Sequence, residues 1–180
     1  MRRLAHRVST RVYGPRRHLR GLSWVGAEPR LAIGAIPVGA EIDALPEQGI
    51  THVVVCRAPL QTVLSQDLWS ARRVLGPDSV AHAPMWDDGR PKDPALWAPA
   101  ARFAARALED DPDARVLVHC QQGRRRSVMV AYAILRLRGM PPDEAERAVL
   151  ETRPHGALVP AYRDSVERWL QEARTAGLLR

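Results

Sequence analysis

The sequence predicts a single α/β domain, in which helices flank a central, mostly parallel sheet and the C-terminal third is helical. Short β-rich runs alternate with helical stretches as far as residue 120. The 180 residues are enough to bury a core without staples, and 46% hydrophobic with 26% charged residues is the composition of a globular domain. No apolar run approaches the length of a transmembrane helix.

The predicted strands are four short runs of aliphatic and β-branched residues. They occupy residues 31–36, 50–56, 79–83 and 116–119. The second run, ITHVVVC, has a continuous β-branched centre, which is typical of a parallel strand buried on both faces.

Helices are predicted between and after these strands, at residues 38–48, 61–75, 94–108, 126–138, 142–152 and 162–176. Asp93 is the expected N-cap of the third helix, with Pro94 at its first position. Gly139 is expected to end the fourth. The last three helices follow one another without an intervening strand, so the C-terminal third is helical.

A basic arm, residues 1–23, is expected to precede the globular domain, residues 24–180. The arm holds seven arginines and no acidic residue, whereas the rest of the chain has 20 basic and 20 acidic residues, so the net charge of +7 belongs to the arm. Because the arm lacks the apolar core of a secretory signal, we expect a cytoplasmic protein. The same arginine-rich composition also fits a mitochondrial transit peptide, which is the alternative.

The partners of the arm follow from its charge and spacing. A neutral domain argues against nucleic acid as the main partner, because no extended basic stripe continues beyond the arm. Leu4, Val8 and Val12 recur at helical spacing beside arginines, which is compatible with weak contact with an anionic membrane. The simplest interpretation is a solvated terminus.

The segment at residues 116–134, VLVHCQQGRRRSVMVAYAI, carries the clearest chemical signal. A hydrophobic strand ends at Cys120, and Arg126 follows six positions later at the start of an apolar-periodic helix. The loop between them contains Gly123, which is free to adopt a positive φ, so that successive N–H groups can point inward. Together with the positive end of the helix dipole, this loop would cradle a dianionic phosphate, which Arg126 would bind with two hydrogen bonds.

The same positive field would activate Cys120 as a nucleophile. A helix N-terminus and a neighbouring arginine lower the pKa of a thiol, which leaves it ionised at neutral pH. Ser127 can donate its hydroxyl to the sulfur and stabilise the thiolate. Two cysteines in the chain, Cys56 and Cys120, are too few for a disulfide framework or an all-cysteine zinc site, and no cofactor or metal is expected.

These residues resemble a known family, the cysteine-dependent protein tyrosine phosphatases, on the dual-specificity side. His119, Cys120, Gly123, Arg126 and Ser127 match the family pattern H-C-x-x-G-x-x-R-S. The resemblance extends over about residues 24–172. It implies the tyrosine-phosphatase fold and a phosphomonoester hydrolase that works through a cysteinyl-phosphate intermediate.

The resemblance also implies which residues bind the phosphate group. They are Gln121, Gln122, Gly123, Arg124, Arg125 and Arg126. Dual-specificity members often have serine immediately before the catalytic arginine, and this chain has Arg125 there. Arg124 and Arg125 are open to two interpretations. Either both side chains are simply solvated, or they give the site a preference for polyanionic substrates, such as phosphoinositides, phospholipids or multiply phosphorylated peptides.

A general acid is needed to protonate the leaving oxygen, and residues 84–91, PMWDDGRP, offer two carboxyl groups. The family pattern P-x-x-D and the spacing to the following helix favour Asp87. The spelling Trp86-x-Asp88-Gly resembles the W-P-D loop of classical tyrosine phosphatases and favours Asp88. We predict Asp87 and keep Asp88 as the alternative.

Four further residues have weaker signals. His119 is expected to orient the loop, and His155 and Tyr162 fall where the family's last loop borders the pocket, so either could contact the substrate. Cys56 is expected to be a small buried hydrophobe. In a lipid phosphatase of this superfamily, however, a cysteine at a similar strand end forms a disulfide with the nucleophile.

Four functions remain open at this point. The first is a protein tyrosine or dual-specificity phosphatase that acts on a phosphorylated protein. The second is a phosphoinositide or phospholipid phosphatase of the same fold. The third is a module that binds a phosphorylated ligand with little turnover, and a rhodanese-like sulfur transferase is a further enzymatic rival that would need no acid loop.

Overall fold

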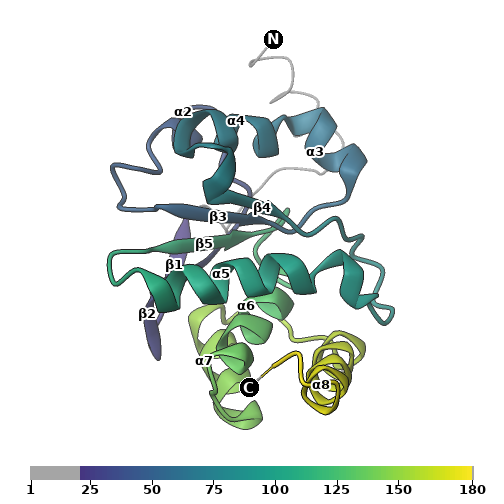
Figure 1. Cartoon of the computed structure of the whole chain (residues 1–180). Helices are drawn as coiled ribbons and strands as arrows, with labels where there is room; N and C mark the ends of the chain where they lie inside the picture. Colours follow the sequence, from purple (N-terminus) through teal and green to yellow (C-terminus); the bar gives the residue numbers. More distant parts are fainter. Residues whose placement is uncertain (1–20, 180) are drawn as a thin grey trace.

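The structure is a computed structural model that describes residues 21–179, and Figure 1 shows its architecture. The predicted α/β fold is confirmed: a five-stranded sheet, ordered β1-β2-β5-β3-β4, lies between two layers of helices. The sequence expectations that concern residues 1–20 lie outside the described residues. None of the helices in residues 21–179 combines the length and apolar composition needed to span a membrane.

The sheet consists of β1 (Leu22–Val25), β2 (Glu28–Gly34), β3 (His52–Val55), β4 (Val80–His82) and β5 (Val116–His119). The four predicted strands all form, and β2, β5, β3 and β4 run parallel to one another. Strand β1, which pairs antiparallel with β2 at the edge of the sheet, was not predicted. This short strand begins before residue 24, where the globular domain was expected to start.

Helices cover both faces of the sheet. On one face lie α5 (Ala98–Asp110), α6 (Arg126–Leu137), α7 (Pro142–Thr152) and α8 (Pro160–Thr175), which form the larger core cluster. On the other face, α2 (Ala40–Asp43) and α4 (Asp67–Leu75) contribute to a smaller core. Successive residues of β3 and β5 alternate between the two cores, as the period of a strand requires.

Two predicted helices are interrupted. The helix expected at 61–75 is α3 (Pro59–Ser65) followed by α4, because Gln66 between them adopts a left-handed conformation with φ of 56°. The helix expected at 94–108 begins as the 3-10 turn η2 (Pro94–Leu96), which Asp93 caps as predicted by accepting a hydrogen bond from the Ala95 N–H. A second 3-10 turn, η1 (Pro77–Ser79), precedes β4.

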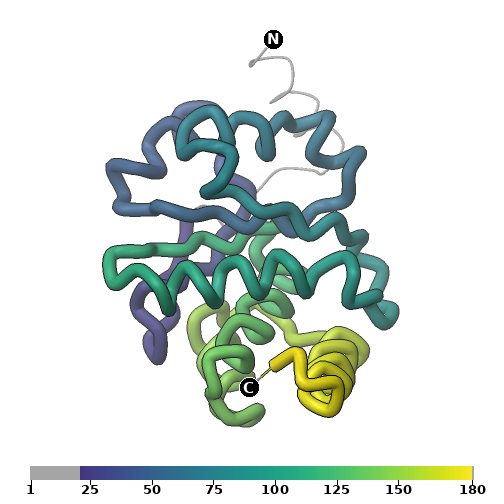
Figure 2. Tube along the Cα trace, viewed as in Figure 1, coloured from purple at the N-terminus to yellow at the C-terminus, as the bar shows by residue number. Residues whose placement is uncertain are grey.

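Only four residues of the helix expected at 38–48 are helical, as α2. The three C-terminal helices form close to their predicted bounds. Figure 2 traces the path of the chain in the same view as Figure 1. Because β2, β3, β4 and β5 are parallel, their carboxyl ends lie along the same edge of the sheet, where α/β proteins hold their ligands. The segments that follow β3, β4 and β5 therefore meet at this edge.

Candidate active site

The loop after β5 has the conformation that the glycine signal predicted. Gly123 has φ of 67°, in the left-handed region that favours glycine. A Cβ atom at this position would lie 2.6 Å from Nη2 of Arg153 and 2.7 Å from the carbonyl group of Gly34, so neither space nor backbone conformation admits a side chain. The tight passage of the loop over β2 therefore depends on glycine.

Arg153, which follows α7, holds the outer side of this loop. Its Nε donates to the Gly123 carbonyl at 3.1 Å and its Nη2 to the Gln122 carbonyl at 3.3 Å. Since the N–H of a trans peptide points opposite to its C=O, the N–H groups of Gly123 and Arg124 are turned away from Arg153. Arg153 was not predicted as a site residue. The only signal that could have found it is its position at the start of a segment that resembles the family's last loop.

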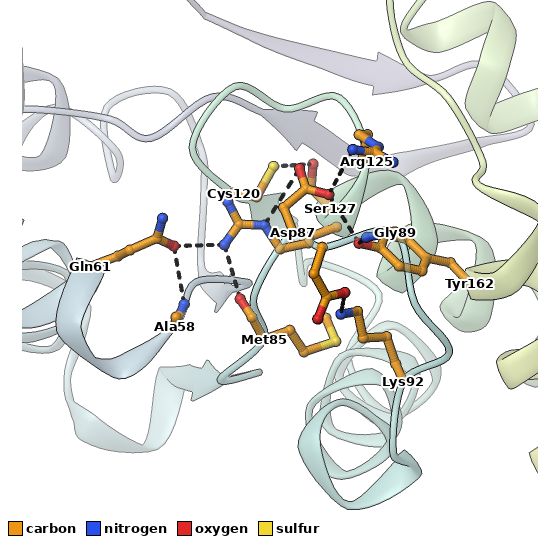
Figure 3. A network of polar contacts seen from close by, with 12 residues as sticks. Ala58, Gln61, Met85, Asp87, Gly89, Lys92, Cys120, Arg125, Ser127 and Tyr162 are labelled. Atoms are coloured by element: carbon orange, nitrogen blue, oxygen red, sulfur yellow. Dashed lines mark hydrogen bonds and ion pairs between the residues drawn. The ribbon is translucent and has the colours of Figure 1, made fainter. Parts of the chain in front are cut away.

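Cys120 lies at the base of the loop with only 2% of its surface exposed. Burial by itself raises the pKa of this thiol. The charge of Arg126, the hydroxyl of Ser127 and the backbone N–H groups of Ser127 and Arg124 act in the opposite direction, and the net result is a pKa below the ordinary value. The Ser127 Oγ lies 3.3 Å from the Cys120 Sγ and donates to it, as Figure 3 shows. The geometry thus supplies the donors that stabilise a thiolate.

Arg126 begins α6 and is held by two neutral acceptors. Its Nη1 donates to Oε1 of Gln61 at 2.7 Å and to the carbonyl of Met85 at 3.0 Å. Gln61, on α3, also accepts a hydrogen bond from the Ala58 N–H. The buried Nε of Arg126 has no hydrogen-bond partner among the described residues, and the nearest carboxylate oxygen, Oδ2 of Asp87, is 4.0 Å away. The guanidinium is therefore positioned without being neutralised at close range.

The two candidate acids have different surroundings. Asp87 faces Cys120 and Arg126, and its Oδ1 accepts a hydrogen bond from Tyr162 at 3.0 Å and lies 3.3 Å from Nη1 of Arg125. Asp88 has other partners, because its side chain pairs with Lys92 and also accepts a hydrogen bond from the Arg90 N–H. The hydrogen bond from Lys92 is the main reason that the pKa of Asp88 is lowered. This arrangement places Asp87, and not Asp88, at the site.

Tyr162, on α8, anchors the segment at residues 84–91 that carries Asp87, called here the acid loop. Its hydroxyl accepts the Gly89 N–H at 3.1 Å while it donates to Asp87. Burial, followed by the charge of Asp87, raises the pKa of Tyr162 to about 12, so the hydroxyl keeps the proton that it donates. Tyr162 was expected as a substrate contact. In the structure its hydroxyl instead contacts Asp87 and the Gly89 N–H, and Tyr162 does not line the pocket.

A pocket of about 550 Å³ opens over Cys120. Its lining comes from the segments after β3, β4 and β5 and from the loop after α7, and it consists of Gln61, Asp87, Cys120, Gln121, Gln122, Arg124, Arg125, Arg126, His155 and Ala157. Most of the predicted site residues are thus brought together. Gly123 and Ser127 do not line the pocket, and act through the loop conformation and the sulfur respectively.

His119 and Cys56 lie behind the loop. His119 is buried, which lowers its pKa to about 4 and keeps the ring neutral. Neither ring nitrogen has a well-formed hydrogen bond within residues 21–179, so the expected orienting network is not seen there. Cys56 is buried as well and its N–H donates to the His119 carbonyl at 2.7 Å. Among the described residues, no three His, Cys, Asp or Glu side chains come together as a metal site.

The whole structure resembles solved phosphatases. Human DUSP28 is 22% identical, with the alignment covering 85% of this chain and 95% of the other and a TM-score of 0.62. Tk-PTP in its active form is 26% identical over 85% and 97% of the two chains, with a TM-score of 0.66. PTPMT1 in complex with PI(5)P is 18% identical over 82% and 94%, with a TM-score of 0.68.

No protein-family model matches the sequence, and no curated protein matches it significantly. The three structural matches nevertheless cover between 82% and 85% of this chain. The chain therefore has the fold of the cysteine-based tyrosine and dual-specificity phosphatases, as the motif at Cys120 predicted.

Proposed function

We propose that this protein is a phosphomonoester hydrolase of the protein tyrosine or dual-specificity type that works through a cysteinyl-phosphate intermediate. One observation carries the proposal. A thiol whose pKa is lowered, Cys120, shares a pocket with an arginine held by neutral partners and with a carboxyl group on a separate loop. A nucleophile, an anion binder and a proton donor are the three parts that metal-free phosphoryl transfer to cysteine requires.

In the first step, the Cys120 thiolate attacks phosphorus. The S–P bond forms as the P–O bond to the leaving group breaks, and the electron pair of that bond stays on the leaving oxygen, which takes the proton of Asp87. The loop N–H groups of residues 121–126 and the Arg126 guanidinium hold the other phosphate oxygens as negative charge builds up on them.

In the second step, water attacks the cysteinyl phosphate. Asp87, now a carboxylate, takes a proton from the water, an O–P bond forms and the S–P bond breaks. The electron pair returns to Cys120, and the Ser127 hydroxyl stabilises the thiolate as it leaves. Inorganic phosphate and the starting state of the enzyme result.

The substrate that we propose is an anionic phosphorylated molecule, either a protein or a lipid headgroup. Arg124 and Arg125 line the pocket beside Arg126, so its mouth is unusually basic. One related structure was solved with PI(5)P bound, which supports a lipid phosphatase as the alternative. A binding module without turnover would not require a carboxyl group such as Asp87 beside the thiol.

The direct test is phosphate release from an aryl phosphate, a phosphotyrosine peptide, a phosphothreonine peptide and a phosphoinositide, measured side by side. We expect turnover of the aryl phosphate, and the ranking of the other three identifies the substrate class. Chelation with EDTA should leave turnover unchanged. If none of the four is hydrolysed while phosphate esters still bind, the protein is a binding module.

The acid is tested by the matched variants Asp87→Asn and Asp88→Asn. Asp87→Asn should slow alkyl phosphates by about 10²-fold and phenyl phosphates less, because a poorer leaving group depends more on protonation. Asp88→Asn should have little effect, and the reverse pattern would assign the acid to Asp88.

A further inference from the structure

We propose that the rim of this pocket is a docking surface for an anionic lipid bilayer. The surface, called here the rim surface, consists of Leu60, Val63 and Leu64 on α3, Trp86 on the acid loop, and Arg124 and Arg125 at the pocket mouth. The inference goes beyond the proposed chemistry, because binding to a bilayer requires no turnover. It rests on exposure, position and charge.

The first observation is an exposed apolar stripe on α3. Leu60 is 57% exposed, Val63 54% and Leu64 36%. These residues stand at positions i, i+3 and i+4, which lie on one face of a helix. The other two residues of the same turn, Gln61 and Thr62, are buried. The helix carries no charged side chain, so its outward face is continuous apolar surface of the kind that marks an interaction site.

The second observation is that this stripe borders the pocket. Gln61, next to Leu60, lines the pocket and accepts a hydrogen bond from Nη1 of Arg126. The same nitrogen donates to the carbonyl of Met85, whose neighbour Trp86 is 51% exposed. Arg126 thus ties together the two segments that carry the exposed apolar residues. Leucine and tryptophan are the side chains that interfacial proteins insert at the boundary of headgroups and acyl chains.

The third observation is positive charge on the same side of the molecule. Arg124 and Arg125 line the mouth of the pocket. Of the two acids between Trp86 and Gly89, Asp87 lies 3.3 Å from Arg125 and Asp88 is paired with Lys92, which leaves Arg124 without a carboxylate partner among the described residues. Arginines beside inserted apolar residues bind the phosphates of anionic lipids, which is the complementarity that a bilayer offers.

The arm joins the domain at this edge too. Gly21 precedes Leu22, which pairs with Gly34, and Gly34 pairs with His119 just before the nucleophile. The segment that precedes Gly21 contains seven arginines and no acidic residue. In sequence, seven arginines thus precede a residue at this edge, and positive charge favours attraction to an anionic surface.

The test is flotation of the full chain with vesicles of phosphatidylcholine, alone or with about 30% phosphatidylserine, at low and high salt. We expect binding to the anionic vesicles that weakens as salt is raised. The double variant Leu60→Ser, Val63→Ser should reduce the partition coefficient by roughly tenfold, because two inserted aliphatic side chains are lost. Hydrolysis of a soluble aryl phosphate by this variant should stay unchanged, which shows that the fold and the pocket are intact.

Leu178→Ser is the matched control. Leu178 is 63% exposed and follows α8, on the other side of the sheet from α3. This variant should bind vesicles like the wild type. A loss of binding equal to that of the double variant would mean that any exposed leucine matters, and would overturn the proposal.

Three other results would overturn it. The first is no binding to anionic vesicles at low salt. The second is binding that is lost in the full-chain variant Arg16→Gln, Arg17→Gln, Arg20→Gln but unaffected by Leu60→Ser, Val63→Ser, which would place the contact in the arm alone. The third is a double variant that loses kcat/KM on a phosphopeptide but still binds vesicles, which would make the rim surface a protein-docking site. Flotation needs no turnover, so failure of the proposed hydrolase activity would leave this result readable.

Discussion

The carboxyl ends of β3 and β5 form a natural comparison inside one molecule. The two strands are parallel neighbours, and Val55 pairs with His119, so that Cys56 and Cys120 occupy the next position on each strand. Both thiols are buried. Yet burial, with a smaller contribution from Cys120, raises the pKa of Cys56 well above its ordinary value, while the pKa of Cys120 is lowered despite its burial.

An arginine accompanies each cysteine, but the two arginines have different partners. Arg57 follows Cys56 directly, and its Nη1 forms an ion pair with Asp67 at 2.7 Å. Arg126, by contrast, is held by an amide oxygen and a backbone carbonyl. At Cys56 burial outweighs the charge of Arg126, which acts to lower the pKa there too, whereas at Cys120 that charge is joined by N–H and O–H donors of the loop.

Replacing each thiol in turn is expected to give the largest difference in turnover between two variants. Cys120→Ser should lower turnover by at least about 10³-fold while the affinity for a phosphate ester is kept, because the hydroxyl is not ionised at neutral pH and the loop remains. Cys56→Ser should keep turnover within a few-fold of wild type. Steady-state kinetics and calorimetric binding measure both. Substantial activity in the Cys120→Ser variant would exclude Cys120 as the nucleophile.

The two arginines can be compared by conservative replacement. Arg126→Lys should reduce kcat/KM by about 10²-fold, since a point charge replaces a planar fork that binds two phosphate oxygens. Arg57→Lys should instead lower the melting temperature and leave the kcat/KM of the folded protein largely unchanged, because it disturbs only a buried ion pair. A loss below about tenfold in Arg126→Lys would contradict its role.

Ser127→Ala removes a hydrogen bond to the Cys120 sulfur that has no counterpart at Cys56. The hydrogen bond from Ser127 helps to lower the pKa of Cys120, so its loss should raise that pKa. The rise of kcat/KM with pH on the acidic side should then shift to higher pH, because the thiolate forms later. Breakdown of the cysteinyl phosphate should slow by about tenfold, seen as a larger burst in pre-steady-state kinetics. An unmoved acidic limb would mean that Ser127 does not act on the sulfur.

Gln61→Glu would give Arg126 the kind of partner that Arg57 has. A carboxylate beside the guanidinium should raise the pKa of Cys120 and weaken phosphate binding, with kcat/KM falling by about three- to tenfold. The exposed Gln48 offers the matched control, since Gln48→Glu adds the same charge elsewhere on the surface. If both variants behave alike, the neutral partner of Arg126 is unimportant.

The smallest expected effect concerns whether Cys56 and Cys120 can form a disulfide bond. Neighbouring parallel strands are about 4.8 Å apart, and a disulfide needs Cα atoms within ~7 Å, so Cys56 is in range to capture an oxidised Cys120. Mild peroxide should inactivate the wild type and dithiothreitol should restore it. Cys56→Ser should recover less completely, because the sulfenic acid oxidises further without a captor. Equal recovery would leave Cys56 as part of the core.

Local sequence signals predicted the parts of this protein that depend on neighbours along the chain. The strand ending at His119, the turn at Gly123 and the helix from Arg126 are contiguous, and their residue types suit no other local structure. The division of 61–75 into α3 and α4 was missed, because Gln66 has no residue-type signal for a left-handed conformation. The edge strand β1 was missed because four residues beside a turn carry too little periodicity.

By itself, the sequence determined the α/β class, the turn at Gly123 between a strand and a helix, and the presence of two adjacent aspartates, Asp87 and Asp88, as candidate acids. Tertiary structure alone decided that Asp87 faces Cys120 while Asp88 pairs with Lys92, that Gln61 and Met85 hold Arg126, and that Cys56 lies beside Cys120. The physical reason is distance along the chain. Gln61 and Arg126 are 65 residues apart and Tyr162 and Asp87 are 75 apart, so only the packing of helices on a parallel sheet brings them into contact.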